Sequence, residues 1–113
     1  MLNSPITQNQ HAPGLEILFF KTAWSGMSRL FEQRIARVLA RFNRLDILKI
    51  VDLDVDPDSS EQYGIYTVPA VVFICAGRIC GRLDKVVNEQ EISQFLNLME
   101  DHIHHNKYIQ TED

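Results

Sequence analysis

Two serines, Ser25 and Ser28, stand three residues apart where an apolar segment gives way to a helical pattern. A serine in this place can act as a nucleophile if a neighbouring base activates it. It can also cap the helix by accepting a hydrogen bond from a backbone N–H group. No histidine lies near these serines in the sequence. We therefore interpret Ser25 as a helix cap, and we predict neither a catalytic residue nor an enzymatic activity here.

The chain has two cysteines, Cys75 and Cys80, on either side of the turn residues Ala76-Gly77. A two-residue turn would place Phe73 opposite Cys80 and Cys75 opposite Arg78, so that the cysteines become diagonal neighbours on one face. Their Cα atoms would then be about 7 to 8 Å apart, which is marginal for a disulfide. We predict two small buried apolar residues, with a redox-sensing pair as the alternative.

Histidines gather near the C-terminus, where His102, His104 and His105 follow Asp101. His102 and His105 could share one helix face and bind Zn²⁺. The polar segment 104–113 is expected to fray as a flexible tail, which would not hold ligands in place. We therefore predict no metal site and no cofactor.

Arginines form a stripe on the first predicted helix. By 100° per residue they fall within an arc of about 140°, and they are Arg29, Arg34, Arg37, Arg41 and Arg44. One interpretation is a solvated face, balanced in part by acidic side chains from elsewhere in the chain. The other is an electrostatic contact with an acidic partner.

The elements that must position these residues follow from hydrophobic periodicity. Strands are predicted over 15–20, 46–51, 69–75 and 78–83, and helices over 25–43, from about Asp56 to Gly64, and over 89–103. The helical crossover makes the first two strands parallel, whereas the last two form an antiparallel hairpin. The pattern predicts an α/β fold with a mixed sheet and helices on both faces. We expect one domain over 14–103, preceded by a flexible arm over 1–13.

Composition limits the function. The 113 residues are 45% apolar and 23% charged, with a net charge of −4, which argues against nucleic-acid binding. No apolar run approaches the roughly 20 residues that span a bilayer. Residues 1–14 lack the basic start and apolar core of a secretory signal, so we expect a cytoplasmic location.

Three motifs, in order and at matching separations, resemble the thioredoxin family over residues 15–100. They are the junction Trp24–Ser28, the run Val51–Pro57 with Tyr63-Gly64-Ile65, and Thr67-Val68-Pro69. The resemblance implies a three-layer sandwich. It also implies a cis bond between Val68 and Pro69 that faces the Trp24–Ser28 segment.

The departures from this family are as informative. Ser25 and Ser28 stand where the family has its two redox cysteines, and Phe19 and Ile50 stand where it has a buried Asp and its partner Lys. Lys85 replaces a glycine before the last helix. The coordinated loss of the thiols and their polar support indicates a member without redox activity.

The resemblance also implies a groove for extended peptide beside Trp24, unless this ring packs against neighbouring loops. We predict a protein- or peptide-binding, chaperone-like module, monomeric or weakly dimeric. Its binding residues would be Trp24, Ser25, Gly26, Met27, Ser28, Val68 and Pro69. The alternatives are a weak thiol-disulfide oxidoreductase or redox sensor that uses Cys75 and Cys80, and a self-associating structural protein.

Overall fold

The fold is seen in a computed structural model that describes the backbone of residues 14–112 and the side chains of residues 14–103. In chain order the elements are β1 (Leu15–Lys21), α2 (Gly26–Arg41), the 3₁₀ helix η1 (Leu45–Ile47), β2 (Leu48–Asp52), α3 (Asp58–Tyr63), β3 (Ala70–Cys75), β4 (Arg78–Leu83) and α4 (Glu89–Glu112). The predicted flexible arm over 1–13 lies outside the described residues.

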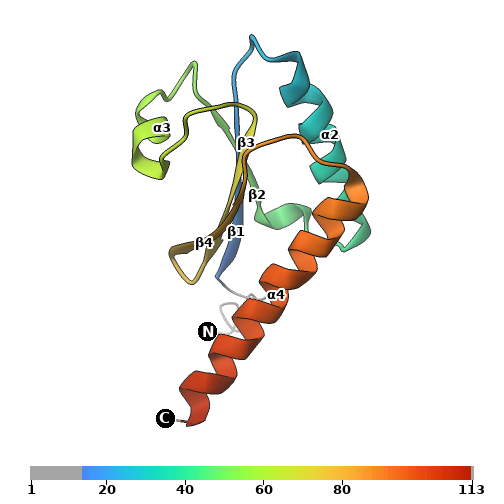
Figure 1. The fold of residues 1–113 in the computed structure, drawn as a ribbon, viewed down its shortest axis with the longest axis vertical. Helices are drawn as coiled ribbons and strands as arrows, with labels where there is room; N and C mark the ends of the chain where they lie inside the picture. Colours follow the sequence, from blue (N-terminus) through green and yellow to red (C-terminus); the bar gives the residue numbers. More distant parts are fainter. Residues whose placement is uncertain (1–13, 113) are drawn as a thin grey trace, which may run out of the picture.

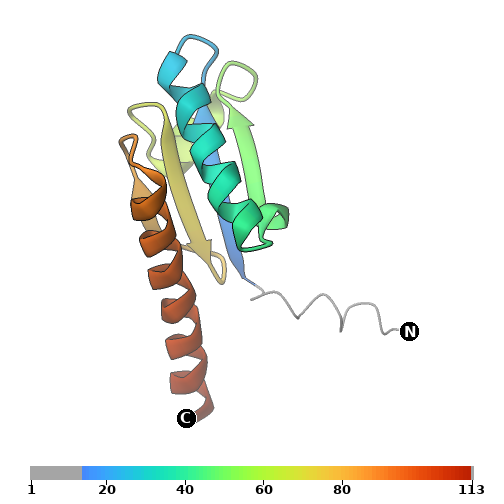
Figure 2. The same ribbon diagram turned by 90° about the vertical axis from the view of Figure 1, so that its right-hand side faces the viewer.

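The four strands form one mixed sheet in the order β2-β1-β3-β4. β1 runs parallel to β2, whereas β1 with β3 and β3 with β4 pair antiparallel. Helices α2 and α4 lie side by side on one face of the sheet, and α3 lies on the other (Figures 1 and 2). This arrangement confirms the predicted α/β three-layer architecture.

A hydrophobic core fills each space between sheet and helices. The larger core packs β1 and β3 against α2 and α4, and in it the rings of Phe19 and Phe31 meet edge to face, 5.9 Å apart. The smaller core lies toward α3, where the ring of Phe20 lies 5.5 Å from that of Tyr63. Both faces of β1 are therefore buried, as its nearly continuous apolar run predicts.

Local signals in the sequence set several element ends. Ser25 caps α2, since its Oγ accepts the N–H of Ser28 at 3.2 Å. Asn88 and Glu91 form a reciprocal capping box at the start of α4. Gly64 ends α3 in the left-handed conformation, with φ 67°.

Several predicted boundaries are wrong, and one is the end of α2, which stops at Arg41 and not at residue 43. Asp46 and Ile47 belong to η1, and the strand begins only at Leu48. A 3₁₀ turn at this point still lets Ile47 pack against the larger core, which is why an apolar pattern alone did not separate it from the strand. Helix α4 continues to Glu112 instead of ending at Ile103, and it extends beyond the end of the sheet (Figure 2). No glycine or proline stands between residues 104 and 112 to stop it.

No helix within residues 14–112 combines the length and the hydropathy that crossing a bilayer requires.

Candidate functional site

The Trp24–Ser28 segment and Pro69 lie at the same edge of the sheet. β1 ends at Lys21, three residues before Trp24, and the register pairs Phe20 with Ala70, the residue after Pro69. The end of β1 and the start of β3 are therefore level with each other. The peptide bond between Val68 and Pro69 is cis, as the resemblance implies.

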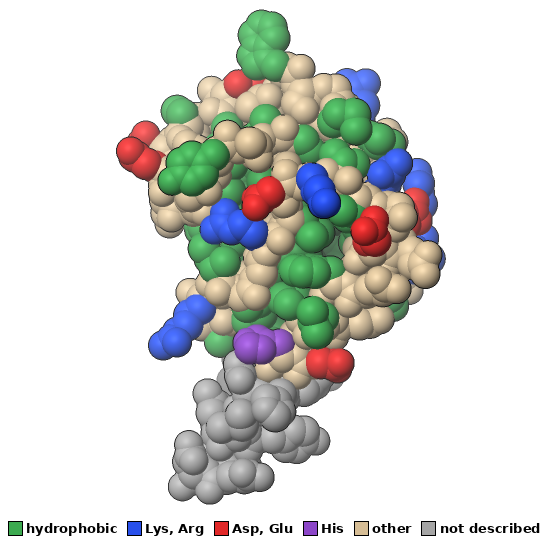
Figure 3. Space-filling view, viewed as in Figure 1, with side chains coloured by type: hydrophobic (Ala, Val, Ile, Leu, Met, Phe, Trp, Pro, Cys, Tyr) green, Lys and Arg blue, Asp and Glu red, His purple; other side chains and the backbone are tan. Residues whose placement is uncertain are grey.

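This edge of the molecule exposes large apolar side chains. Trp24 is 89% exposed and Met27 is 50% exposed, so Trp24 is not packed against neighbouring loops. Val68 is half-buried, and Pro69 is buried behind it. Hydrophobic side chains stand out from the surface at the end of the molecule where α2 begins (Figure 3).

Tyr66 was not predicted from the sequence. It is 94% exposed and lies in the loop that leads from α3 to Pro69. A tyrosine between the buried Ile65 and the polar Thr67 is compatible with both a buried and an exposed ring, so the sequence carries no signal for its exposure.

The start of α2 contains a hydroxyl group without a partner. Ser28 is only 2% exposed, and its Oγ makes no hydrogen bond within the described part of the chain. This side chain helps to line a cavity of about 230 Å³, which we call the α2 cavity. The other lining residues come from the end of β1, the first turn of α2 and the end of β2, and they are Lys21, Thr22, Ala23, Ser25, Arg29 and Asp52.

Apolar side chains stand where the resemblance would place the polar support of two redox thiols. Phe19 and Ile50 are direct neighbours across β1 and β2, where the resemblance would place a buried carboxylate and its lysine. Phe19 is fully buried. A serine hydroxyl is far too weak an acid to ionise without strong assistance, and neither the buried Phe19 nor the 38% exposed Ile50 supplies a polar group.

Four of the five arginines in the predicted stripe bind within the chain. Arg34 donates to the backbone carbonyl of Val87, just before α4, with an N–O distance of 3.0 Å. The remaining three bind carboxylates of α4, with Arg37 and Arg41 on Glu89 and Arg44 on Glu100. This agrees with the interpretation of a face balanced by acidic residues from elsewhere.

These ion pairs have an electrostatic consequence at α4. Hydrogen bonds from Arg41 and Arg37 lower the pKa of Glu89 below its ordinary value of 4.5. The exception in the stripe is Arg29, which is exposed and has no ion pair or hydrogen bond with any residue in 14–103. Only this arginine lies next to the predicted binding residues.

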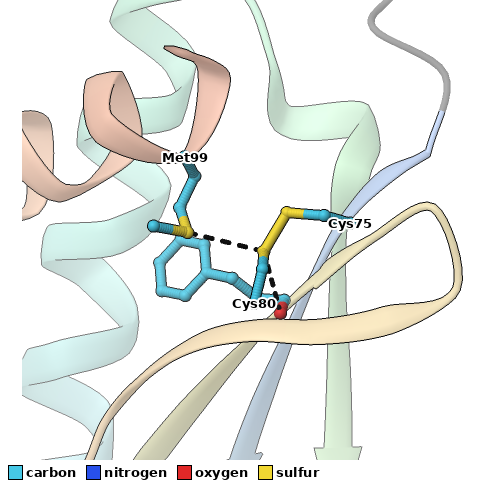
Figure 4. The surroundings of a disulfide bond; sticks show 4 residues. Cys75, Cys80 and Met99 are labelled. Atoms are coloured by element: carbon cyan, nitrogen blue, oxygen red, sulfur yellow. Dashed lines mark hydrogen bonds between the residues drawn. A yellow bond between two sulfur atoms is a disulfide. The ribbon is translucent and has the colours of Figure 1, made fainter. Parts of the chain in front are cut away.

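The prediction of two unlinked cysteines is wrong, because Cys75 and Cys80 form a disulfide with a Cα–Cα distance of 5.7 Å (Figure 4). Cys75 does pair with Arg78, but Phe73 pairs with Gly81 and not with Cys80. Cys80 is thus the extra residue of a β-bulge, and the bulge brings it closer to Cys75 than a regular ladder would.

The disulfide faces the core against α4. The Sγ of Cys80 lies 3.5 Å from the Sδ of Met99 and 3.4 Å from the backbone oxygen of Phe73 (Figure 4). A Cβ atom on Gly81 would come within 2.9 Å of the Phe95 ring, so the close packing of α4 requires a glycine there. A glycine inside a strand is a known sign of a bulge, and this signal could have predicted the register shift.

A second cavity, of about 380 Å³, lies between α4 and the residues that follow β4. Its lining is mainly apolar, with Leu83, Val87, Phe95 and Leu98, and Lys85 and Glu91 add the charges. The sequence did not predict this cavity, because its walls come from elements whose relative placement is tertiary.

The predicted absence of a metal site is not tested for the whole chain. Among the described residues, no three His, Cys, Asp or Glu side chains lie close enough to hold an ion. His102 is exposed, and the side chains of His104 and His105 lie outside the described residues.

Comparisons with known proteins identify the architecture. No protein-family model matches the chain. Thioredoxin H2 of Arabidopsis thaliana is 28% identical over 69 residues, which are 61% of this chain and 51% of that protein. The chain is thus matched to only about half the length of this curated relative.

Solved structures are similar over most of the chain. A malaria parasite thioredoxin-2, described as a component of protein secretion machinery, superposes with a TM-score of 0.68 at 14% identity, covering 74% of this chain and 81% of that one. The thioredoxin of Fasciola hepatica superposes with a TM-score of 0.67 at 19% identity, covering 83% and 88%. The chain therefore has the thioredoxin fold.

Proposed function

Starting from this thioredoxin fold, we propose that the protein is a binding module without oxidoreductase activity at the start of α2. It holds an extended peptide, or a segment of a partner protein, on a surface that we call the Trp24 surface. This surface consists of Trp24, Ser25, Gly26, Met27, Ser28, Val68 and Pro69. The observation that carries the proposal is the 89% exposure of the Trp24 side chain.

The chemistry of the Trp24 surface fits a peptide chain. An indole ring offers a large apolar face and one N–H donor, a combination enriched at protein interfaces. Met27 adds a flexible apolar side chain that adapts to different partners. Val68, directly before Pro69, would supply main-chain hydrogen bonds to a peptide added in strand-like fashion.

The replacements at the start of α2 support binding over redox chemistry. Serines cannot form the disulfide that an exchange cycle needs, and the neighbouring Phe19 and Ile50 offer no proton relay. The name of the malaria parasite relative places a protein with this fold in a protein secretion machinery. That setting supports protein partners for the present chain, as a proposal.

The test compares wild type with Trp24→Ala. Trp24 is the only tryptophan of the chain, so its fluorescence reports on this surface in the wild type, whereas calorimetry measures binding in both proteins. Peptides selected from a random library on the wild type should bind the variant at least about tenfold more weakly, since large aromatic anchors dominate interfaces. Leu98→Ala is the matched control, because Leu98 is also exposed (58%) but lies on α4.

Unaltered capture by Trp24→Ala would contradict the proposal. The titrations should span a wide range of protein concentration, because a self-associating protein would occupy the same surface with its own copies. Binding that weakens as the protein concentration rises would then favour the structural alternative.

A second candidate is thiol-disulfide exchange through Cys75 and Cys80, and the disulfide between them favours it. This bond lies at the opposite edge of the sheet from Trp24, since the register pairs Cys75 with Leu15 at the start of β1. Insulin reduction driven by a thioredoxin reductase measures the activity. Turnover that disappears in Cys75→Ser would overturn the binding-only function.

A further inference from the structure

The α2 cavity contains groups that suit a negatively charged ligand. Ser28 places a buried hydroxyl without a partner in its wall. Such groups are rare in native structures because burial without a hydrogen bond costs free energy, and each one calls for an explanation. A ligand that accepts a hydrogen bond from this hydroxyl would supply one.

The end of the helix adds a favourable field. α2 is 16 residues long and begins at this cavity, and its first turn contains no acidic residue. The N–H of Ser28 already donates to the Oγ of Ser25, so the helix start offers the cavity mainly the partial positive charge of its dipole. Helix starts of this kind bind phosphate and carboxylate groups.

Side-chain charges at the cavity are two cations and one anion. Arg29 has no partner among the described residues and keeps all its donors available. Lys21 lies 3.6 Å from Glu32, so part of its charge is already balanced. A guanidinium group can bind an oxyanion through two parallel hydrogen bonds.

Asp52 opposes an anion in the same cavity. One of its carboxylate oxygens accepts the backbone N–H of Asp54 at 2.9 Å, and Asp54 in turn accepts the N–H of Ala23 at 2.9 Å. These carboxylates therefore hold the loops around the cavity in place. The negative charge of Asp52 lowers the affinity of the cavity for an anion. Replacing Asp52 with Asn therefore tests the hypothesis.

We propose that the α2 cavity is an oxyanion site, which binds a phosphate or carboxylate group. In this site Ser28 donates its hydroxyl hydrogen, Arg29 pairs with the charge, and the start of α2 contributes the partial positive charge of its dipole. The volume of about 230 Å³ is large enough for such a group with some of its hydration water. The site shares Ser25 and Ser28 with the Trp24 surface, but anion binding at it does not require Trp24.

Inorganic phosphate is the first probe, and backbone amide NMR shifts are the measurement, at constant ionic strength with chloride as the reference anion. We expect saturable shifts for the amides of residues 25–29. Ser28→Ala and Arg29→Gln should each weaken binding by about tenfold, since hydrogen bonds to charged groups are roughly twice as strong as neutral ones. Asp52→Asn should tighten binding several-fold, because it removes the opposing charge and keeps the acceptor for Asp54.

Acetate is the second probe, and it separates the two possible ligand groups. Tighter binding of phosphate would indicate a phosphorylated ligand, whereas tighter binding of acetate would indicate an acidic side chain or a chain terminus. Either result supports the shared oxyanion chemistry.

Arg78→Gln is the matched control, because Arg78 is an exposed arginine at the turn between β3 and β4. It should leave both titrations unchanged. Trp24→Ala should also leave them unchanged, which separates this site from the peptide surface. Shifts that never saturate, equal midpoints in wild type, Ser28→Ala and Arg29→Gln, or weaker binding by Asp52→Asn would each overturn the proposal.

Discussion

The two ends of α2 differ in how their polar and apolar side chains are used. Toward its C-terminal end, Arg37 and Arg41 bind a carboxylate of α4, as does Arg44 just before η1. At its N-terminal end, Trp24 is exposed, Arg29 has no partner within residues 14–103, and the hydroxyl of Ser28 is buried without a hydrogen bond. One end binds α4 through ion pairs, although Nε and Nη2 of Arg44 are buried without a hydrogen bond within residues 14–103, and the other end exposes its large apolar side chains.

This difference shows that arginines on the same predicted helix face can have different roles in the folded protein. All five arginines share one helix face in the sequence, but only those within reach of α4 and the residues before it find intramolecular partners. The arginine stripe is therefore not one continuous docking surface, because α4 and Val87 just before it already bind four of its five members. Arg29, which has no partner among residues 14–103, is the arginine of the stripe beside the exposed Trp24 surface.

The largest effect is expected at the C-terminal end, from Glu100→Gln. The ion pair of Glu100 with Arg44 is mostly buried, with side-chain exposures of 22% and 13%. Removing one charge leaves the guanidinium without its anion, which should lower the free energy of unfolding by about 2 kcal/mol. Urea unfolding measures this loss, and Asp101→Asn on the exposed side of α4 serves as the control. Equal stability of the two variants would show that the pair between Arg44 and Glu100 does not stabilise the fold.

Two serine variants at the N-terminal end should change stability in opposite directions. Ser25→Ala removes a cap that accepts the N–H of Ser28, and it should destabilise the protein by about 1 kcal/mol. Ser28→Ala removes a buried hydroxyl without a partner and should stabilise it by about 1 kcal/mol in the absence of anions. Thermal unfolding of both variants checks the signs. A destabilised Ser28→Ala would mean that the hydroxyl has a partner in the free protein.

A pH-dependent effect is expected from Glu89. Because Arg41 and Arg37 lower the pKa of Glu89, its carboxylate is held more strongly in the folded state than in the unfolded state. Its contribution to stability is present above the unfolded pKa of about 4.5 and is lost as the pH falls through the lower folded value. The stability difference between wild type and Glu89→Gln should therefore shrink on acidification and with added salt. Denaturation at several pH values measures it, and a constant difference would contradict the ion pairs.

The smallest effect on stability is expected from Trp24→Ala. An indole that is 89% exposed makes few contacts with the folded chain. Its removal should change the free energy of unfolding by less than about 0.5 kcal/mol, as is usual for surface positions. Urea unfolding of this variant is also the control for the peptide-binding test. A larger loss would show that Trp24 packs in solution, and it would weaken the case for an open binding surface.

Most of the fold could be predicted because its signals are local and agree with one another. The apolar run before Lys21, the cap at Ser25 and the glycine at 64 each determine an element end within a few residues. The motifs around Trp24 and Pro69 then indicate the thioredoxin fold, which the comparisons confirm. The end of α4 was missed because a polar segment without glycine or proline gives no stop signal.

The candidate sites could be predicted only in part. The residues around Trp24 and Pro69 follow from the motifs, whereas the exposure of Tyr66 and the cavity beside Ser28 do not. The disulfide was missed because the register of β4 shifts at Cys80, and one residue of shift changes which side chains meet.

The sequence by itself determined the order of the elements, the helix cap at Ser25 and the presence of two serines, not thiols, at the start of α2. Each of these depends on residues that are close together in the chain. Only the tertiary structure decided which arginines bind α4, that Cys75 and Cys80 are joined, and that Ser28 is left without a partner beside Arg29. These facts depend on distances between residues far apart in the chain or on one step of strand register, which local propensity does not specify.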